Sequence, residues 1–85
     1  MPSYAILGCG LSARSVIDDL FARGQTDFTI YVRPGEVAAT RAEFPGVRVT
    51  DAWENIREEY LVRSPGVRPD LPSIARAVAG GSVLT

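Results

Sequence analysis

The 85-residue sequence contains neither lysine nor histidine, and all nine of its cationic side chains are arginines. The absence of histidine removes the usual general base at neutral pH and the commonest metal ligand. The absence of lysine removes the cation of a phosphate-binding loop. Cysteine is nearly absent as well: Cys9 stands alone, which excludes an internal disulfide and fits a reducing compartment.

Long apolar runs and charge of one sign are also missing. No apolar segment approaches the roughly 20 residues of a membrane span, and the first residues do not resemble a secretory signal. The formal net charge is -1, so we expect neither nucleic acid nor a membrane surface as a partner. These features predict a cytoplasmic protein.

The sequence does contain short apolar segments that alternate with amphipathic ones. Strands are expected at 4–7, 28–32, 47–50, 60–63 and 82–85, with helices at 12–23, 36–44 and 70–79 and a helical turn or two within 51–57. This alternation predicts an α/β, Rossmann-like three-layer fold with a five-stranded parallel sheet, order 3-2-1-4-5, and helices on both faces. We interpret residues 1–85 as one domain, and its end after a fifth strand suggests a fragment of a larger protein.

A glycine turn joins the first strand to the first helix. Gly8 can adopt backbone angles closed to other residues, Gly10 lets a ligand approach the main chain, and Ala13 lets helix and strand pack closely. The following helix, capped by Ser12, offers free N–H groups and a positive dipole end to an anion. The same glycines also serve ordinary strand-to-helix packing. Cys9 is interpreted as a small residue that fills the turn.

Two other turns are expected at the same edge of the sheet. Arg33 follows the second strand, and Ser64-Pro65-Gly66 follows the fourth. In the order 3-2-1-4-5 the switch point lies between strands one and four, at their carboxyl ends, where such sheets bind ligands. Trp53 and Ile56 are expected to face the sheet, and Ile74, Ala75 and Val78 to form the buried stripe of the last helix.

A nicotinamide dinucleotide site would need an acidic residue at the end of the second strand. Tyr31-Val32-Arg33 occupies that place, Asp27 comes too early and Glu36 lies beyond the loop. NAD is therefore disfavoured, whereas Arg33 is compatible with the 2′-phosphate of NADP. A small NAD(P)-binding module of an oxidoreductase or regulator remains an alternative, as does a structural domain without a ligand.

Four segments together resemble the N-terminal domain of the Mur ligases, and most closely that of the D-glutamate-adding enzymes. The family has G-x-G-x-[ST]-G before a helix ending in A-R-G, an arginine after the second strand, S-P-G-[IV], and H-P-x-[IL]. The corresponding residues are Gly8 to Ala13 with Ala22-Arg23-Gly24, Arg33, Ser64-Pro65-Gly66-Val67, and Leu71-Pro72-Ser73-Ile74. Here Ala13 replaces a glycine, Leu71 a histidine, and Tyr31-Val32 an Asp-Thr pair at the place of a uracil contact.

The resemblance implies a UDP-anchoring domain of a peptidoglycan-synthesising ligase that adds D-glutamate to UDP-N-acetylmuramoyl-L-alanine through an acyl phosphate. It assigns the UDP moiety to Gly8, Gly10, Leu11, Ser12, Arg33, Ser64, Pro65 and Gly66. The full enzyme would use ATP and Mg²⁺ on central and C-terminal domains. The sequence lacks their G-x-x-G-K-[ST] loop, so we expect no catalytic residue, metal site or cofactor site within residues 1–85.

Overall fold

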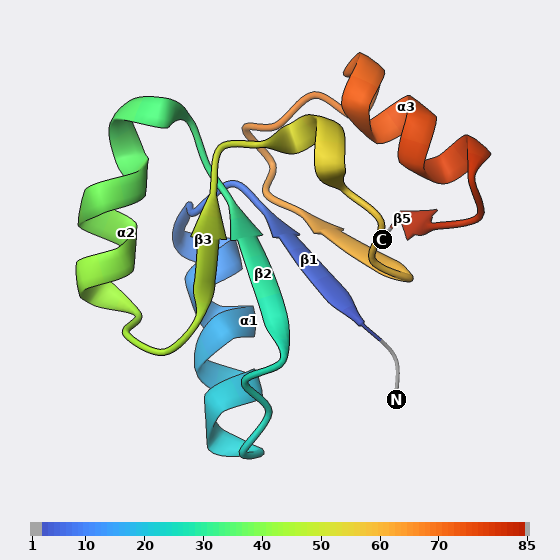
Figure 1. The fold of residues 1–85 in the computed structure, drawn as a ribbon. Coiled ribbons are helices and arrows are strands. Elements are labelled where there is room, and N and C mark those ends of the chain that lie inside the picture. Colours follow the sequence, from blue (N-terminus) through green and yellow to red (C-terminus); the bar gives the residue numbers. More distant parts are fainter. Residues whose placement is uncertain (1–2, 85) are drawn as a thin grey trace.

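The computed structural model describes residues 3–84, apart from the side chains of residues 11 and 12. Five parallel strands form a single sheet in the order β3-β2-β1-β4-β5 (Figure 1). The predicted α/β, Rossmann-like topology is therefore confirmed. The strands are β1 (Tyr4–Leu7), β2 (Phe28–Tyr31), β3 (Arg48–Thr50), β4 (Tyr60–Arg63) and β5 (Val83–Leu84). Thr85, which was included in the fifth predicted strand, lies outside the described residues.

The helical segments follow the prediction with corrected ends. They are α1 (Leu11–Ala22), the 3-10 turn η1 (Pro34–Glu36), α2 (Val37–Glu43), the 3-10 turn η2 (Trp53–Asn55) and α3 (Pro72–Ala79). The predicted cap Ser12 is wrong: Gly10 caps α1, because its carbonyl already accepts the Arg14 N–H at 3.0 Å. Gly24, with φ +72°, ends α1 as expected.

Helices cover both faces of the sheet. Strand side chains alternate between the faces, so one face presents Ile6 and Ile30 to α1 and α2, and the other presents Leu7 and Leu61 to α3 and η2. Ala13 is only 2% exposed, as expected for a small residue that lets α1 approach the sheet closely. The two apolar clusters hold the strand ends in place, and with them the turns that follow those ends.

The buried stripe of α3 differs from the predicted one. Ile74 is buried as expected and Ala77 is buried beside it, whereas Ala75 and Val78 are exposed, Val78 by 43%. Helix α3 lies over the end of the sheet (Figure 1), where β5 has two residues. Ile74 and Ala77, three residues apart, pack in the second apolar cluster with Ile56 and Leu61, and this contact sets the buried side of the helix.

At the opposite end of the sheet, β3 is an edge strand. The Val32 N–H donates to the Thr50 carbonyl at 3.0 Å, so the carbonyl of the preceding Val49 points away from β2. Arg41 of α2 donates to this Val49 carbonyl from Nε at 3.3 Å and from Nη2 at 3.1 Å. The Arg41 guanidinium therefore occupies a backbone acceptor, the Val49 carbonyl, on the open edge of the sheet.

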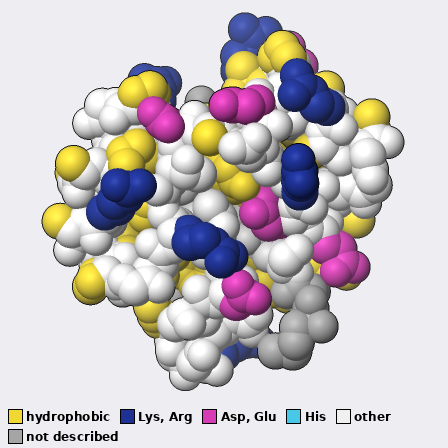
Figure 2. Space-filling view, viewed as in Figure 1, with side chains coloured by type: hydrophobic (Ala, Val, Ile, Leu, Met, Phe, Trp, Pro, Cys, Tyr) yellow, Lys and Arg dark blue, Asp and Glu magenta, His cyan; other side chains and the backbone are white. Residues whose placement is uncertain are grey.

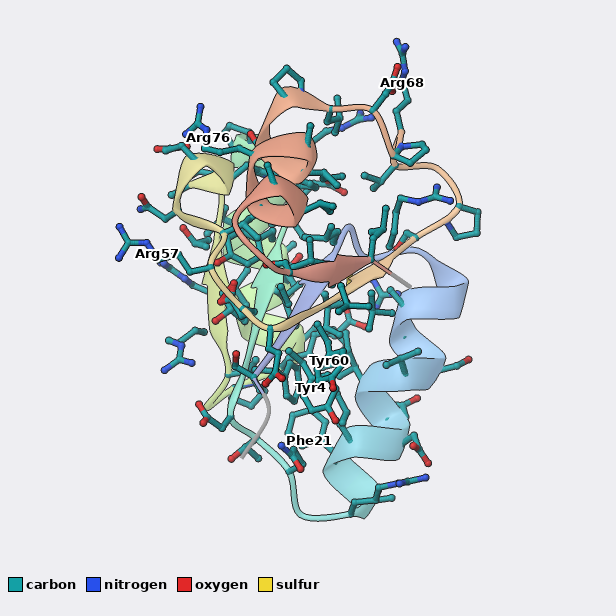
Figure 3. The ribbon with its side chains drawn as sticks, turned by 90° about the vertical axis from the view of Figure 1, so that its right-hand side faces the viewer. Tyr4, Phe21, Arg57, Tyr60, Arg68 and Arg76 are labelled. Atoms are coloured by element: carbon teal, nitrogen blue, oxygen red, sulfur yellow. The ribbon has the colours of Figure 1, made fainter. Side chains whose placement is uncertain are left out.

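Aromatic side chains gather toward the N-terminal ends of the strands. Tyr4 and Tyr60 stack with their ring centroids 5.7 Å apart, and Figure 3 shows them near Phe21 and far from Arg68.

Tyr31 is 3% exposed, and its hydroxyl donates to Glu58 Oε1 at 2.8 Å. Burial, and after it the hydrogen bond and charge of Glu58, raise the pKa of Tyr31.

This raised pKa predicts a loss of stability in alkali. A phenol whose pKa is higher in the folded state stabilises the fold fully below its unfolded pKa of about 10 and loses that contribution as the pH rises above it. We expect the free energy of unfolding to fall as the pH rises above about 10, and Tyr31→Phe to flatten this fall. Urea unfolding at several pH values measures it, and an equally steep fall in Tyr31→Phe would assign it to other groups.

Candidate functional site

A cleft of about 830 Å³ opens where the carboxyl ends of β1, β2 and β4 meet. This is the switch point of the sheet, the usual ligand position in such folds. We call it the switch-point cleft. Its lining residues come from four stretches of the chain: Gly8, Cys9, Gly10, Val32, Arg33, Glu36, Trp53, Ser64, Pro65, Gly66, Val67, Arg68 and Leu71.

The glycine turn forms one wall of this cleft. Gly8 has φ +86°, and its N–H donates to the Tyr31 carbonyl at 2.8 Å. A Cβ at Gly8 would lie 2.8 Å from Val67 Cγ2 and 3.2 Å from the Ser64 hydroxyl oxygen. Gly8 therefore permits both the turn itself and its contact with the segment after β4.

Gly10 differs from Gly8. Its φ is -82°, which any residue can adopt, and a Cβ built there would meet nothing within 4 Å. No backbone geometry and no packing requires a glycine at this position. Because Gly10 lines the cleft, the open space beside it leaves the main chain accessible to a ligand.

Helix α1 begins directly at this wall. Gly10 has no side chain to cap the helix, and the first turn carries no acidic residue. The first N–H groups of a helix lack intrahelical acceptors and lie at the positive end of the dipole. Leu11 and Ser12, which were assigned to the ligand through their backbone, form the start of this turn, and their side chains lie outside the described part of the chain.

Ser64 forms part of the floor of the cleft. Its N–H donates to the Leu7 carbonyl at 3.0 Å, and its carbonyl accepts the Val67 N–H at 2.9 Å. The residue is 5% exposed, and its hydroxyl has no hydrogen-bond partner within the described residues. Buried polar atoms are nearly always paired, so this hydroxyl is an unused donor and acceptor beside the glycine turn.

The cationic side chains at the cleft differ in their pairing. Arg68 donates to both carboxylate oxygens of Asp70, at 3.1 Å and 2.8 Å, and Figure 3 shows it pointing away from the body of the protein. Arg33, exposed at the end of β2, forms no ion pair within residues 3–84. Arg33 is therefore the cation available to a ligand anion.

Several lining residues were not predicted as part of the site, and Glu36 and Trp53 are the two that add polar groups from other turns. Glu36 was placed beyond the loop, but the tight turn η1 at Pro34-Gly35 brings it back to the cleft. Trp53 was interpreted as a core residue; it packs in the second apolar cluster and also lines the cleft, with Nε1 donating to the Val32 carbonyl at 2.9 Å. The Pro-Gly pair was the available signal for Glu36, whereas nothing in the sequence indicated the tryptophan hydrogen bond.

Cys9 also lines the cleft. Burial raises the pKa of its thiol, the charge of Arg14 opposes this and that of Glu36 adds to it. Reactive cysteines have a lowered pKa, so this environment is that of a structural side chain. The interpretation of Cys9 as a residue that fills the turn agrees with this geometry.

The arrangement defines a class: an α/β domain of Rossmann-like topology with a ligand-sized cleft at its switch point. Neither a protein-family model nor a curated protein matches the chain.

Within the described residues no group of three His, Cys, Asp or Glu side chains could hold a metal ion, and none of the helices there is long and apolar enough to cross a membrane. On the face drawn in Figure 2, cationic and acidic side chains are interspersed.

Proposed function

We propose that the switch-point cleft binds the UDP moiety of a nucleotide-linked muramoyl substrate. The domain would thereby anchor UDP-N-acetylmuramoyl-L-alanine for an ATP-dependent ligase that adds D-glutamate in peptidoglycan synthesis. The support is a convergence: the glycine turn, Arg33 and Ser64-Pro65-Gly66, which carry the sequence resemblance to the Mur ligases, line a single cleft.

The observation that carries the proposal is the Ser64 hydroxyl, which has no hydrogen-bond partner among the described residues and lies beside the glycine turn, where α1 begins without a side-chain cap. A diphosphate offers several acceptor oxygens and negative charge. The N–H groups of the first helical turn donate to such an anion, and the helix dipole stabilises it. A phosphate oxygen or a bridging water beside Gly8 would supply the partner that the Ser64 hydroxyl lacks.

Amide formation would require parts that residues 1–85 do not provide. The sequence has no lysine for an ATP phosphate loop, and the described residues have no set of side chains suited to Mg²⁺. We therefore assign no chemical step to this chain and propose that its role is to bind and orient the nucleotide end of the substrate.

A nicotinamide dinucleotide is the second candidate, because the unpaired Arg33 could hold a 2′-phosphate. Amide NMR titrations with UDP-N-acetylmuramoyl-L-alanine, UDP and NADP, run in parallel, separate the two functions. Shifts at Gly8 to Ser12, Arg33, Ser64 and Gly66 with the UDP compounds would support the proposal. A response to NADP alone would favour the second candidate, and no response to any of the three would contradict both.

Ser64→Ala is expected to weaken UDP binding without destabilising the domain. Loss of one hydrogen bond corresponds to about 1 kcal/mol, or roughly fivefold in affinity. Because the hydroxyl is buried and unpaired without ligand, its removal leaves the free energy of unfolding unchanged or slightly raised. Calorimetric titration and urea unfolding measure the two effects, with Ser73→Ala, outside the cleft, as the control. Unchanged affinity in Ser64→Ala would remove Ser64 from the site.

A further inference from the structure

Arg63 is a half-buried cation at the end of β4 to which the proposed function assigns no role. It forms no ion pair within residues 3–84, and it does not line the switch-point cleft. Its Nη1 instead donates to the Val67 carbonyl at 2.6 Å and lies 3.5 Å from the Ser64 carbonyl, a longer and weaker contact. The guanidinium therefore stabilises the path of the backbone after β4 rather than a carboxylate.

The turn that Arg63 contacts has few other constraints. This turn, residues 64–67, is called the Ser64 turn. The Val67 N–H donates to the Ser64 carbonyl at 2.9 Å, and Pro65 restricts one φ angle. Gly66 does not adopt a positive φ, so no conformation reserved for glycine defines the turn. The bond from Arg63 to the Val67 carbonyl is thus a second closure of the turn, made by the residue that precedes it.

The closed Ser64 turn lies directly against the glycine turn. A Cβ built on Gly8 would lie 3.2 Å from the Ser64 hydroxyl oxygen and 2.8 Å from Val67 Cγ2, so both ends of the Ser64 turn face Gly8. The buried Ser64 hydroxyl has no hydrogen bond of its own among the described residues to fix its direction. Its direction consequently depends on the backbone of the turn, and Arg63 is the side chain that holds this backbone closed.

We infer that Arg63 is a positioning residue for nucleotide binding: it closes the Ser64 turn and so orients the Ser64 hydroxyl toward the ligand's diphosphate. A hydroxyl that is already oriented loses less conformational entropy when the ligand binds. Because a single nitrogen makes both contacts of Arg63, one ammonium group can replace it, and lysine is the conservative substitute. This inference rests on the proposed function, since it concerns the diphosphate bound in the same cleft.

The test is a double-mutant cycle of Arg63→Met and Ser64→Ala, with UDP affinity measured by calorimetric titration. Arg63→Met keeps an unbranched apolar side chain and removes the donor. We expect it to weaken binding about fivefold, as Ser64→Ala does, because both variants lose the same hydrogen bond to the ligand. In the Ser64→Ala background, Arg63→Met should change the affinity by less than about 1.5-fold, since residues that act as one unit are not additive.

Two further variants accompany the cycle. Arg63→Lys should restore binding to within about twofold of wild type, because its ammonium can donate to the Val67 carbonyl. Arg76→Met is the matched control for charge: Arg76 is exposed on α3, does not line the cleft and forms no ion pair within residues 3–84. It should keep wild-type affinity. Urea unfolding verifies that each variant is folded.

The outcomes separate this inference from the function on which it rests. A fivefold loss that persists in the Ser64→Ala background would overturn the inference, because Arg63 would then act independently of the hydroxyl. Unchanged affinity in Arg63→Met, or an equal loss in Arg63→Lys and Arg63→Met, would overturn it as well and leave the UDP site intact. Failure of UDP and of inorganic pyrophosphate to bind wild-type protein would contradict the proposed function and, with it, the inference.

Discussion

Gly8→Ala should lower the free energy of unfolding by about 3 kcal/mol. This is the largest effect on stability that we expect from a substitution in the glycine turn. A left-handed backbone costs a residue with a Cβ roughly 1–2 kcal/mol, and Gly8 has φ +86°. The new methyl would also lie 2.8 Å from Val67 Cγ2, and relief of such overpacking typically costs about 1–3 kcal/mol. Urea unfolding would show a lower midpoint with an unchanged m-value.

Gly10→Ala is the matched control for this experiment. It makes the same chemical change two positions along the chain, where φ is -82° and the methyl group meets nothing within 4 Å. We expect a change of no more than about 1 kcal/mol, because alanine is a poorer N-cap than glycine. Equal losses in the two variants would contradict our account of Gly8.

Gly10→Val should abolish most UDP binding while the domain stays folded. The branched side chain would occupy the open space through which a ligand reaches the main chain at the start of α1. Loss of charge-assisted hydrogen bonds to a phosphate, worth about 1.5–3 kcal/mol, corresponds to roughly ten- to a hundredfold weaker binding. Calorimetric titration with UDP measures the affinity, and thermal unfolding verifies the fold.

The control for Gly10→Val is Gly35→Val. Gly35 also has open space around its Cα and lies in η1, but it does not line the cleft. We expect this variant to keep its affinity for UDP. Wild-type affinity in Gly10→Val would mean that the ligand does not approach the main chain at this turn.

Much of the fold could be predicted because its signals are local. The apolar runs of β1 and β4 are each followed closely by a glycine or proline turn, and their predicted bounds agree with the structure. The strand order follows from the alternation of strands and helices and from the handedness of crossovers. The stripe of α3 could not be predicted, because the burial of Ala77 and the exposure of Val78 depend on which side of the helix packs against η2 and the second apolar cluster.

The candidate site was predictable in outline. Gly8, Gly10, Arg33 and Ser64-Pro65-Gly66 line one cleft, because parallel strands direct their following turns to the same edge of the sheet. The hydrogen bonds of the side chains could not be predicted: the sequence does not reveal that the Ser64 hydroxyl lacks a partner among the described residues. Glu36 was misplaced because the path of a loop is set by tertiary contacts rather than by periodicity.

The guanidinium of Arg41 on the Val49 carbonyl has a consequence for the behaviour of the protein at high concentration. An open β-edge is a template for strands of other molecules and a common starting point of aggregation. A strand that adds to β3 would have to displace the Arg41 guanidinium before it could pair with the Val49 carbonyl. The exposed side chain of Arg48 adds a charge along the same edge. Intermolecular growth of the sheet is thereby disfavoured at this end.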